Sequence, residues 1–320
     1  IDSLFMGQDR IQEPRELSLM YKTRARCHSG FKEYSEALAD YHKADEILAA
    51  KYPLSDGDRV RLMPLIGGTE HQLGHYAESE KYYRLYAEYT KSLFGERSIE
   101  YIDALLYQAN AEGFADHLDA GCQDYVEAAT ILKSLMKERI PYMSTTERES
   151  FWSPISSLFM MMTPYALQAQ RYQTPFTQSC YDALIMSKAF LLESERSQFE
   201  VVKQEGTKED MRDYMRLALM KNNIKEWEKN YQQYADSILA LSQKADQLAV
   251  RLAERCRGFG DVTAFMDIDY NAVKQVLKPN DILLDFTDFV SETVGRKYAV
   301  YIVNKRDEYP LVKYLFAERQ

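Results

Sequence analysis

The sequence is poor in the residues that interrupt helices and in the residue that crosslinks chains. Its 320 residues include 13 glycines, 9 prolines and 4 cysteines. Scarce glycine, together with 24 tyrosines, favours long packed helices over a loop-rich fold. The cysteines form no Cys-x-x-Cys pair, and a helical chain of this length needs no disulfide staple. We therefore expect reduced thiols in a cytoplasmic protein at Cys27, Cys122, Cys180 and Cys256.

Long apolar runs and an excess of positive charge are also missing. No apolar run is long enough to cross a bilayer as a helix, so the sequence predicts no membrane span. The chain opens with neither a basic nor an apolar stretch, so it shows no secretory signal, and we expect it to be part of a longer protein. The formal net charge is −9, which argues against nucleic acid as a partner.

Common catalytic and metal-binding motifs are absent too. The sequence contains no G-x-x-x-x-G-K-[ST] loop for phosphates and no H-E-x-x-H pair for zinc. Cys27 and His28 are neighbours, so on a helix their side chains point about 100° apart and cannot form a dyad. His71 and His75 flank an expected turn, which separates them. The sequence thus predicts no catalytic residue, no metal site and no cofactor.

What the sequence does contain is a 42-residue internal repeat between about 18 and 136. Small or aromatic residues recur in register three times, which is the pattern of stacked helical pairs. The five columns are Ala25, Gly67 and Ala109; Ala37, Ser79 and Gly121; Tyr41, Tyr83 and Tyr125; Ala44, Tyr86 and Ala128; and Tyr34, Tyr76 and Leu118.

The columns have a mechanical meaning. Two antiparallel helices approach closely where both carry small side chains, and large tyrosines fill the space where they diverge. Each pair leaves an apolar face open, which the next pair covers. Residues 81–91 also interleave basic and aromatic side chains, as some RNA-binding surfaces do, but their tyrosines follow the columns and favour packing.

In these columns the sequence resembles the tetratricopeptide repeat family, whose unit is shorter, at about 34 residues. The spacing across the turn is that of the family, so the additional residues lengthen each helix by about one turn. The column that usually holds Trp has Tyr21, Met63 and Leu105, and Tyr86 is bulky where Ala is typical. The resemblance implies an α-solenoid over residues 1–142, with three repeats and a groove that binds a protein or peptide.

In this family the groove is lined by the first helix of each pair. Carried onto this sequence, that assignment selects the following candidate residues: Lys22, Arg26, Arg61, His71, Gln72, Asp103, Asn110 and Phe114. Charge reversal at Arg26 and Arg61 is then expected to weaken a captured partner. The alternative interpretation is that these side chains are only solvated, and that binding takes place on the other face or elsewhere.

Residues 143–200 are predicted to form a degenerate fourth helical pair. Ser144 and Glu147 have the spacing of a capping box, and Pro154 and Pro164 are expected to split or kink the helix that it opens. The apolar residues 159–162 are interpreted as core filler.

Residues 201–260 are predicted to form a long helical hairpin. Its apolar side chains recur at steps of three, four and seven residues. They are Leu217, Ile224, Trp227, Tyr231, Tyr234, Ile238, Leu241, Leu248 and Leu252. A coiled-coil dimer is the alternative that this spacing leaves open.

Residues 261–320 change character. A short helix before Pro279 is followed by segments rich in Val, Ile, Phe and Tyr, which predict strands over 281–289, 297–304 and 310–316. Residues 299–303 are apolar on both faces, as in a strand that is covered on both sides. We therefore expect the sequence to end inside a domain of incomplete α/β type.

The order of segments over 181–320 resembles the entry into a CHAT domain, a caspase-like peptidase fold that is attached to tetratricopeptide arrays, largely in bacteria. The segments are YDALIMSKAFLLES at 181–194, a hairpin, YNAVKQVLKPNDILLDF at 270–286 and KYAVYIVN at 297–304. Phe190 departs from the Gly common there. The resemblance implies the protein-binding, regulatory region of a cysteine peptidase. That peptidase domain would be a partner, and its catalytic His and Cys match nothing in this chain. A scaffold without activity is the alternative.

Overall fold

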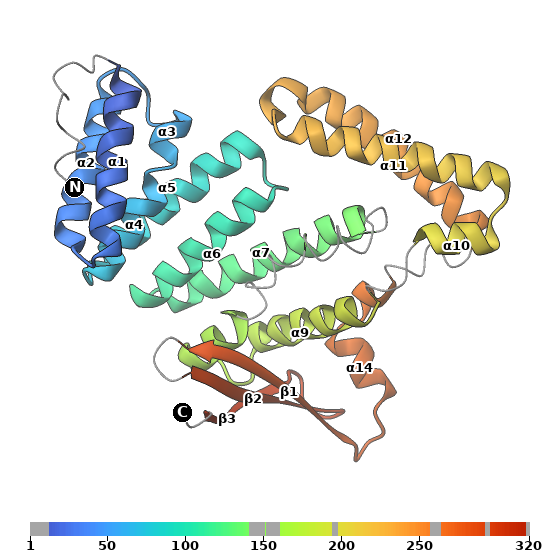
Figure 1. The fold of residues 1–320 in the computed structure, drawn as a ribbon. Helices are drawn as coiled ribbons and strands as arrows, with labels where there is room; N and C mark the ends of the chain where they lie inside the picture. The colour runs from blue at the N-terminus through green and yellow to red at the C-terminus, as the bar shows by residue number, and fades with distance from the viewer. Residues whose placement is uncertain are drawn as a thin grey trace. The chain divides into compact units, whose positions relative to one another are not determined.

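The structure is a computed structural model that describes residues 13–140, 151, 161–193, 198–256, 264–291 and 295–317. These residues are mainly helical, with a small antiparallel sheet of three strands near the C-terminus (Figure 1). The chain divides into two compact units, residues 1–124 and 125–320. The mainly helical fold and the late strands agree with the sequence prediction. No described helix combines the length and apolarity needed to cross a bilayer.

The first unit is built from consecutive helices that each pack against their neighbours. α1 packs on α2, α2 on α4, α4 on α5, and α5 on α6. Residues 13–140, all of them described, contain no strand. The elements are α1 (Pro14–Gly30), α2 (Tyr34–Ala49), α3 (Gly57–Val60), α4 (Met63–Gln72), α5 (Tyr76–Phe94), α6 (Ile99–Phe114) and α7 (Leu118–Arg139), whose later part belongs to the second unit.

The turn inside each helical pair has one geometry, which recurs at the same place in all three repeats. Its central residue adopts a left-handed backbone, with φ of 63° at Lys32, 80° at Gly74 and 67° at Asp116. The next residue donates its backbone N–H to the carbonyl five residues earlier, at 2.9, 2.9 and 2.8 Å. This bond is the one that closes a Schellman motif at a helix C-terminus. The period of the sequence is therefore also a period of the backbone.

The small columns are buried where helices meet. Ala25, Ala37 and Ala44 have no exposed surface. A Cβ atom added to Gly67 of α4 would lie 3.3 Å from the Tyr82 Cβ and from two ring atoms of Tyr83. The glycine thus lets α4 approach α5 closely enough for the tyrosine ring to lie on its backbone, as the spacing predicts.

The second unit continues with a helix over 161–168, the helices α9 (Pro175–Glu193), α10 (Gln198–Glu205), α11 (Lys208–Glu228) and α12 (Tyr231–Arg255), the short η4 (Ala264–Asp267) and α14 (Tyr270–Val276). Pro164 lies within the described helix 161–168 and does not end it. Met162 is fully buried, as expected of core filler. The capping box expected at Ser144 and Glu147, and the break at Pro154, fall outside the described residues.

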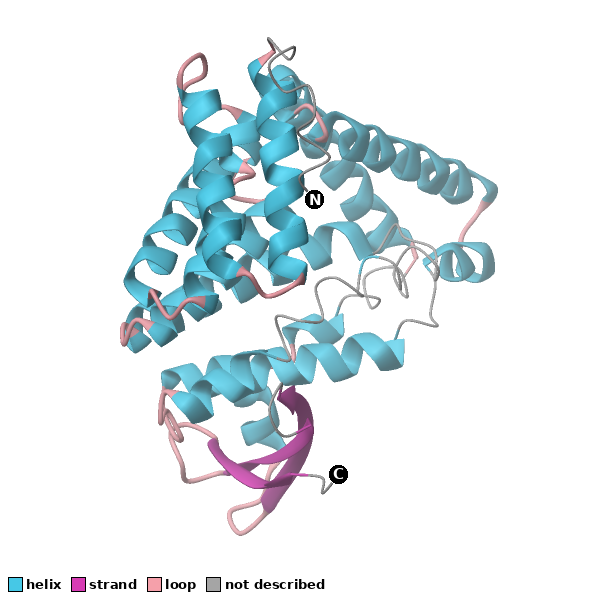
Figure 2. Cartoon of the chain, turned by 60° about the vertical axis from the view of Figure 1, so that its left-hand side comes forward, coloured by secondary structure: helices cyan, strands magenta, loops and turns pink. Residues whose placement is uncertain are grey.

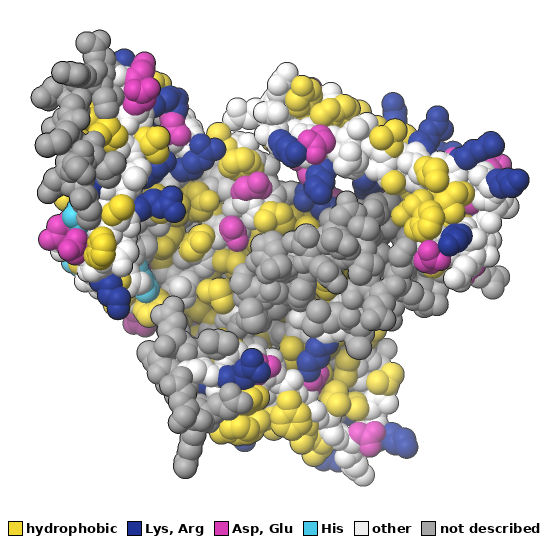
Figure 3. Space-filling model, in the orientation of Figure 1, with side chains coloured by type: hydrophobic (Ala, Val, Ile, Leu, Met, Phe, Trp, Pro, Cys, Tyr) yellow, Lys and Arg dark blue, Asp and Glu magenta, His cyan; other side chains and the backbone are white. Residues whose placement is uncertain are grey.

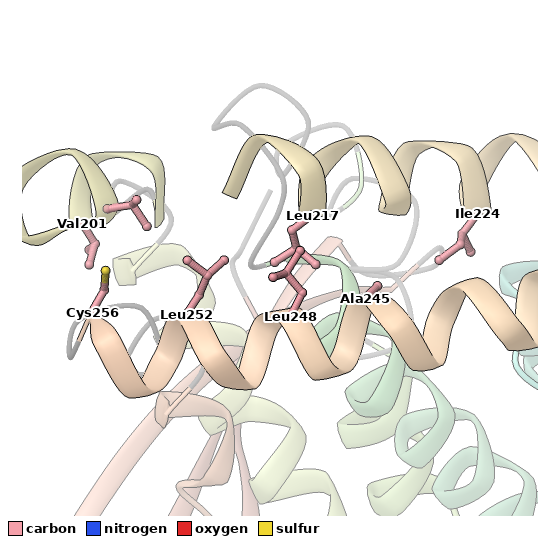
Figure 4. Close-up of a cluster of buried hydrophobic side chains, with 8 residues drawn as sticks. Val201, Leu217, Ile224, Ala245, Leu248, Leu252 and Cys256 are labelled. Carbon is pink, nitrogen blue, oxygen red and sulfur yellow. The ribbon is translucent and has the colours of Figure 1, made fainter. Parts of the chain in front are cut away.

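The helices α11 and α12 pack against each other as a hairpin. Val201, Leu217, Ile224, Ala245, Leu248, Leu252 and Cys256 form one buried cluster along its length (Figure 4). Apolar side chains that recur at three- and four-residue steps thus pack between the two helices of the same chain. The alternative of a coiled-coil dimer is not tested by this packing, and Leu219 and Leu239 of the two arms are 62% and 61% exposed.

A capping box that the sequence prediction missed starts α11, and it makes the hairpin sensitive to acid. The Thr207 hydroxyl accepts the Asp210 N–H at 3.2 Å, and the Asp210 carboxylate accepts the Thr207 N–H at 2.8 Å. Hydrogen bonds from Thr207, followed by the charge of Arg255, hold the Asp210 pKa below its ordinary 3.8. Stability from this carboxylate is thus present above pH 3.8 and lost as pH falls through the lower folded pKa.

We expect Thr207→Ala to destabilise the hairpin by about 1 kcal/mol at neutral pH. Asp210→Asn should flatten the loss of stability below pH 3.8 relative to wild type. Urea unfolding above and below that pH measures both effects. An acid loss as steep in Asp210→Asn as in wild type would contradict this account of the cap.

The sheet has the order β1 (Ile282–Ser291), β2 (Gly295–Asn304) and β3 (Leu311–Ala317), with both pairs antiparallel. One face lies on helices of the same unit (Figure 2). The Tyr301 ring of β2 lies 5.2 Å from the Tyr181 ring of α9, and its hydroxyl is 2.8 Å from that of Thr163. Lys188 of α9 pairs with Asp285 of β1.

The other face of the sheet is apolar and open. The largest exposed side chains are Phe286 on β1, at 58% exposure, and Phe316 on β3, at 56%. Apolar side chains gather over this part of the molecule in Figure 3. β2 itself is buried along residues 299–303 except at Ile302, which is half-buried. The burial of these β2 residues agrees with the sequence prediction, but the exposed Phe286 and Phe316 show that no layer of described residues covers the second face of the sheet.

Candidate protein-binding site

Seven of the eight candidate residues lie on three helices of the first unit. Lys22 and Arg26 lie on α1, His71 and Gln72 on α4, and Asp103, Asn110 and Phe114 on α6. Arg61 is not on the first helix of its pair. It caps the C-terminus of α3, because the chain turns there and α4 starts only at Met63 with Pro64 in its first turn. The sequence assignment of Arg61 to the groove helix is corrected accordingly.

Two of the candidates meet directly. The His71 ring lies 4.4 Å from the Phe114 ring in an edge-to-face contact. Tyr76, the first residue of α5, completes the cluster at 5.3 Å from His71 and 5.4 Å from Phe114. The cluster therefore joins the ends of α4 and α6 through aromatic contacts of the preferred geometry. Phe114 and Tyr76 remain exposed enough to contact a ligand.

α6 presents a stripe of exposed side chains on one face. Asp103, Tyr107 and Phe114 follow at steps of four and seven residues, so they lie above one another. Tyr107 was missed by the sequence prediction. Its ring stacks on Tyr83 at 5.3 Å with 6° between the planes, while 48% of the residue stays exposed. Its spacing from Asp103 is the signal that could have found it.

The pKa of the Asp103 carboxyl is raised although the side chain is exposed. Surrounding protein partly desolvates it and raises its pKa, and the charge of Glu100 raises it further. Burial raises the pKa of Tyr107, with Asp103 as the second cause. No ion pair joins Asp103 to Arg26 or Arg61 among the described residues. Arg61 instead pairs with Asp58 at 3.4 Å.

Two of the histidines noted in the sequence, His28 and His75, are hydrogen-bonded to glutamates. The Nδ1 of His28 lies 2.6 Å from Glu33, and that of His75 lies 2.7 Å from Glu70. Both bonds span the turn of a helical pair. The described part of the chain holds no group of His, Cys, Asp and Glu arranged for a metal ion.

A small cavity of about 190 Å³ lies between α7 and α9 in the second unit. Lys133 and Asp182 supply its charges. Tyr270, the first residue of α14, donates its backbone N–H to the Asp182 carboxylate at 2.6 Å. Burial raises the Asp182 pKa, and this hydrogen bond opposes the shift. Because the carboxylate already holds the start of a helix, the cavity is the weaker candidate.

A scan against models of known protein families finds no match, and no curated protein matches the chain. Among solved structures, the crystal structure of BtubC (BKLC) from P. vanneervenii is similar, with a TM-score of 0.48 and 18% sequence identity. The alignment covers 61% of this chain and 71% of that chain. We draw nothing on function from a likeness of this size, and the site is judged on its own geometry.

Proposed function

We propose that the helical pairs of the first unit form a tetratricopeptide-type solenoid and bind a protein or peptide through α1, α4 and α6. The observation that carries the proposal is the exposed aromatic and acidic stripe of α6, joined to α4 by the contact of His71 with Phe114. Large aromatic side chains at a solvated surface are typical of binding hot spots. The recurrence of the turn in all three pairs supports the repeat architecture.

We further propose that this chain is the regulatory region of a bacterial, cytoplasmic TPR-CHAT cysteine peptidase. The open apolar face of the sheet supports it, because faces of this kind are covered by a further layer in a domain. A ligand on the first unit would then act on the peptidase if it bound one of two conformations better. A scaffold without activity remains the second candidate, and the binding surface would serve both.

Peptides selected from a displayed random library against the full chain test the binding proposal. The double variant Asp103→Lys with Phe114→Ala should weaken the selected peptides by about thirtyfold, as loss of a hot spot does. Glu46→Lys makes the same kind of charge change on exposed α2 and should leave affinity unchanged. If peptides bind the double variant as tightly as wild type, the site lies elsewhere.

A further inference from the structure

The N-terminal half of the α6 stripe has a chemistry of its own. Glu100, Asp103 and Tyr107 follow at steps of three and four residues and are all exposed. The Tyr107 ring stacks on Tyr83 of the adjoining helix α5. Two carboxylates and one tyrosine ring therefore gather on one exposed face of α6.

The negative charge of Asp103 is not compensated by a cation of the described residues. Neither cause of its pKa shift is a cation, since both the surrounding protein and Glu100 raise it. Two basic side chains of the adjoining helix α5 are paired elsewhere. Lys91 pairs with Glu96 at 2.8 Å, and Arg84 lies with the buried Glu80 and Glu112. An accessible carboxylate that is crowded by protein and by a like charge gains most from a cation supplied by another molecule.

The exposed ring of Tyr107 favours a planar cation over a compact one. The Tyr107 ring is held parallel to Tyr83, so its remaining face is presented to solvent in a fixed orientation. A planar guanidinium stacks on such a face while its N–H groups bond a carboxylate. We propose that Glu100, Asp103 and Tyr107 bind an arginine side chain of the protein partner. The proposal rests on the binding function assigned above and adds the charge that the partner must carry.

An apolar partner fits this half of the stripe less well, because it would desolvate two carboxylates without supplying an opposite charge. The aromatic cluster of His71, Tyr76 and Phe114 offers the matching apolar contact further along α6. Eleven helical residues separate Asp103 from Phe114, about 16 Å. The expected partner segment thus carries an arginine and, about five residues further along an extended chain, an apolar or aromatic residue. The separation of the two follows from the positions of Asp103 and Phe114 on one helix.

The test uses a fluorescent Gly-Ser peptide with two arginines, titrated with the full chain and followed by anisotropy. Its match carries citrulline, which keeps the shape and loses the charge. The arginine peptide should bind about tenfold more tightly than the citrulline peptide. Asp103→Asn should remove that difference, and Tyr107→Leu should weaken the arginine peptide several-fold. Glu46→Gln, a neutralised carboxylate on α2, should change neither titration.

A charge swap makes the result specific to the site. Asp103→Lys should prefer the same peptide with glutamates in place of arginines. Equal binding of arginine and citrulline peptides, no binding of either, or a preference that survives Asp103→Asn would each overturn the proposal. If the library peptides bind through Phe114 but carry no basic residue, the binding function stands and only the arginine inference falls.

Discussion

Replacing Tyr301 by alanine should lower the free energy of local opening around β2 by about 3–5 kcal/mol. The side chain is fully buried between the sheet and its helices. Its ring lies 5.2 Å from that of Tyr181, and its hydroxyl bonds Thr163 at 2.8 Å. Alanine removes the ring contacts, leaves a cavity, and leaves a buried hydroxyl without its partner. Hydrogen exchange of the β2 amides measures the opening, since the two units can unfold separately.

Two variants separate the parts of this effect. Tyr301→Phe keeps the ring and loses only the hydrogen bond, so it should cost about 1 kcal/mol. Tyr314→Ala removes an aromatic ring from the exposed strand β3 and should cost about 1 kcal/mol or less. If Tyr301→Ala is no worse than Tyr314→Ala, the helices do not hold the sheet through this side chain.

Replacing Gly67 by leucine should destabilise the first unit by about 3 kcal/mol. Its new Cβ would start 3.3 Å from Tyr82 and Tyr83, and the rest of the side chain would have to displace the tyrosine ring. Since Tyr83 is itself buried, α4 and α5 must move apart. Gly67→Ala should cost less, because the ring can shift slightly to make room for a single methyl group. Urea unfolding followed by circular dichroism measures the loss.

Gly30 provides the control for this substitution. It lies at the end of α1, and nothing stands within 4 Å of the position that a Cβ would occupy. Gly30→Leu should therefore change stability by about 0.5 kcal/mol or less. Similar losses in the two leucine variants would mean that close helix approach does not explain the small columns.

The repeat could be predicted from sequence because all five columns recur with the same 42-residue spacing. The turn geometry could not, since two of its three left-handed residues are Lys32 and Asp116 and only Gly74 carries the usual signal. The contacts between the sheet and its helices could not be predicted from the sequence either. Tyr301 and Thr163 are 138 positions apart, and no local pattern pairs them.

The candidate site was predicted in part. The family pattern selected Asp103 and Phe114, which the structure places on one exposed stripe, but it misplaced Arg61. The pattern assumes that the first helix of each pair starts at the same column. Here α3 interrupts, and Pro64 delays the start of α4. Tyr107 was overlooked because its column is Thr23 and Leu65 in the other repeats, which gives no aromatic signal.

The central claim is that a ligand lies on α1, α4 and α6. Amide hydrogen exchange of the full chain, with and without a selected peptide, tests it most directly. The account predicts slower exchange in Pro14–Gly30, Met63–Gln72 and Ile99–Phe114 when the peptide is bound. Slower exchange confined to Tyr34–Ala49 and Tyr76–Phe94, or to the hairpin of α11 and α12, would contradict it.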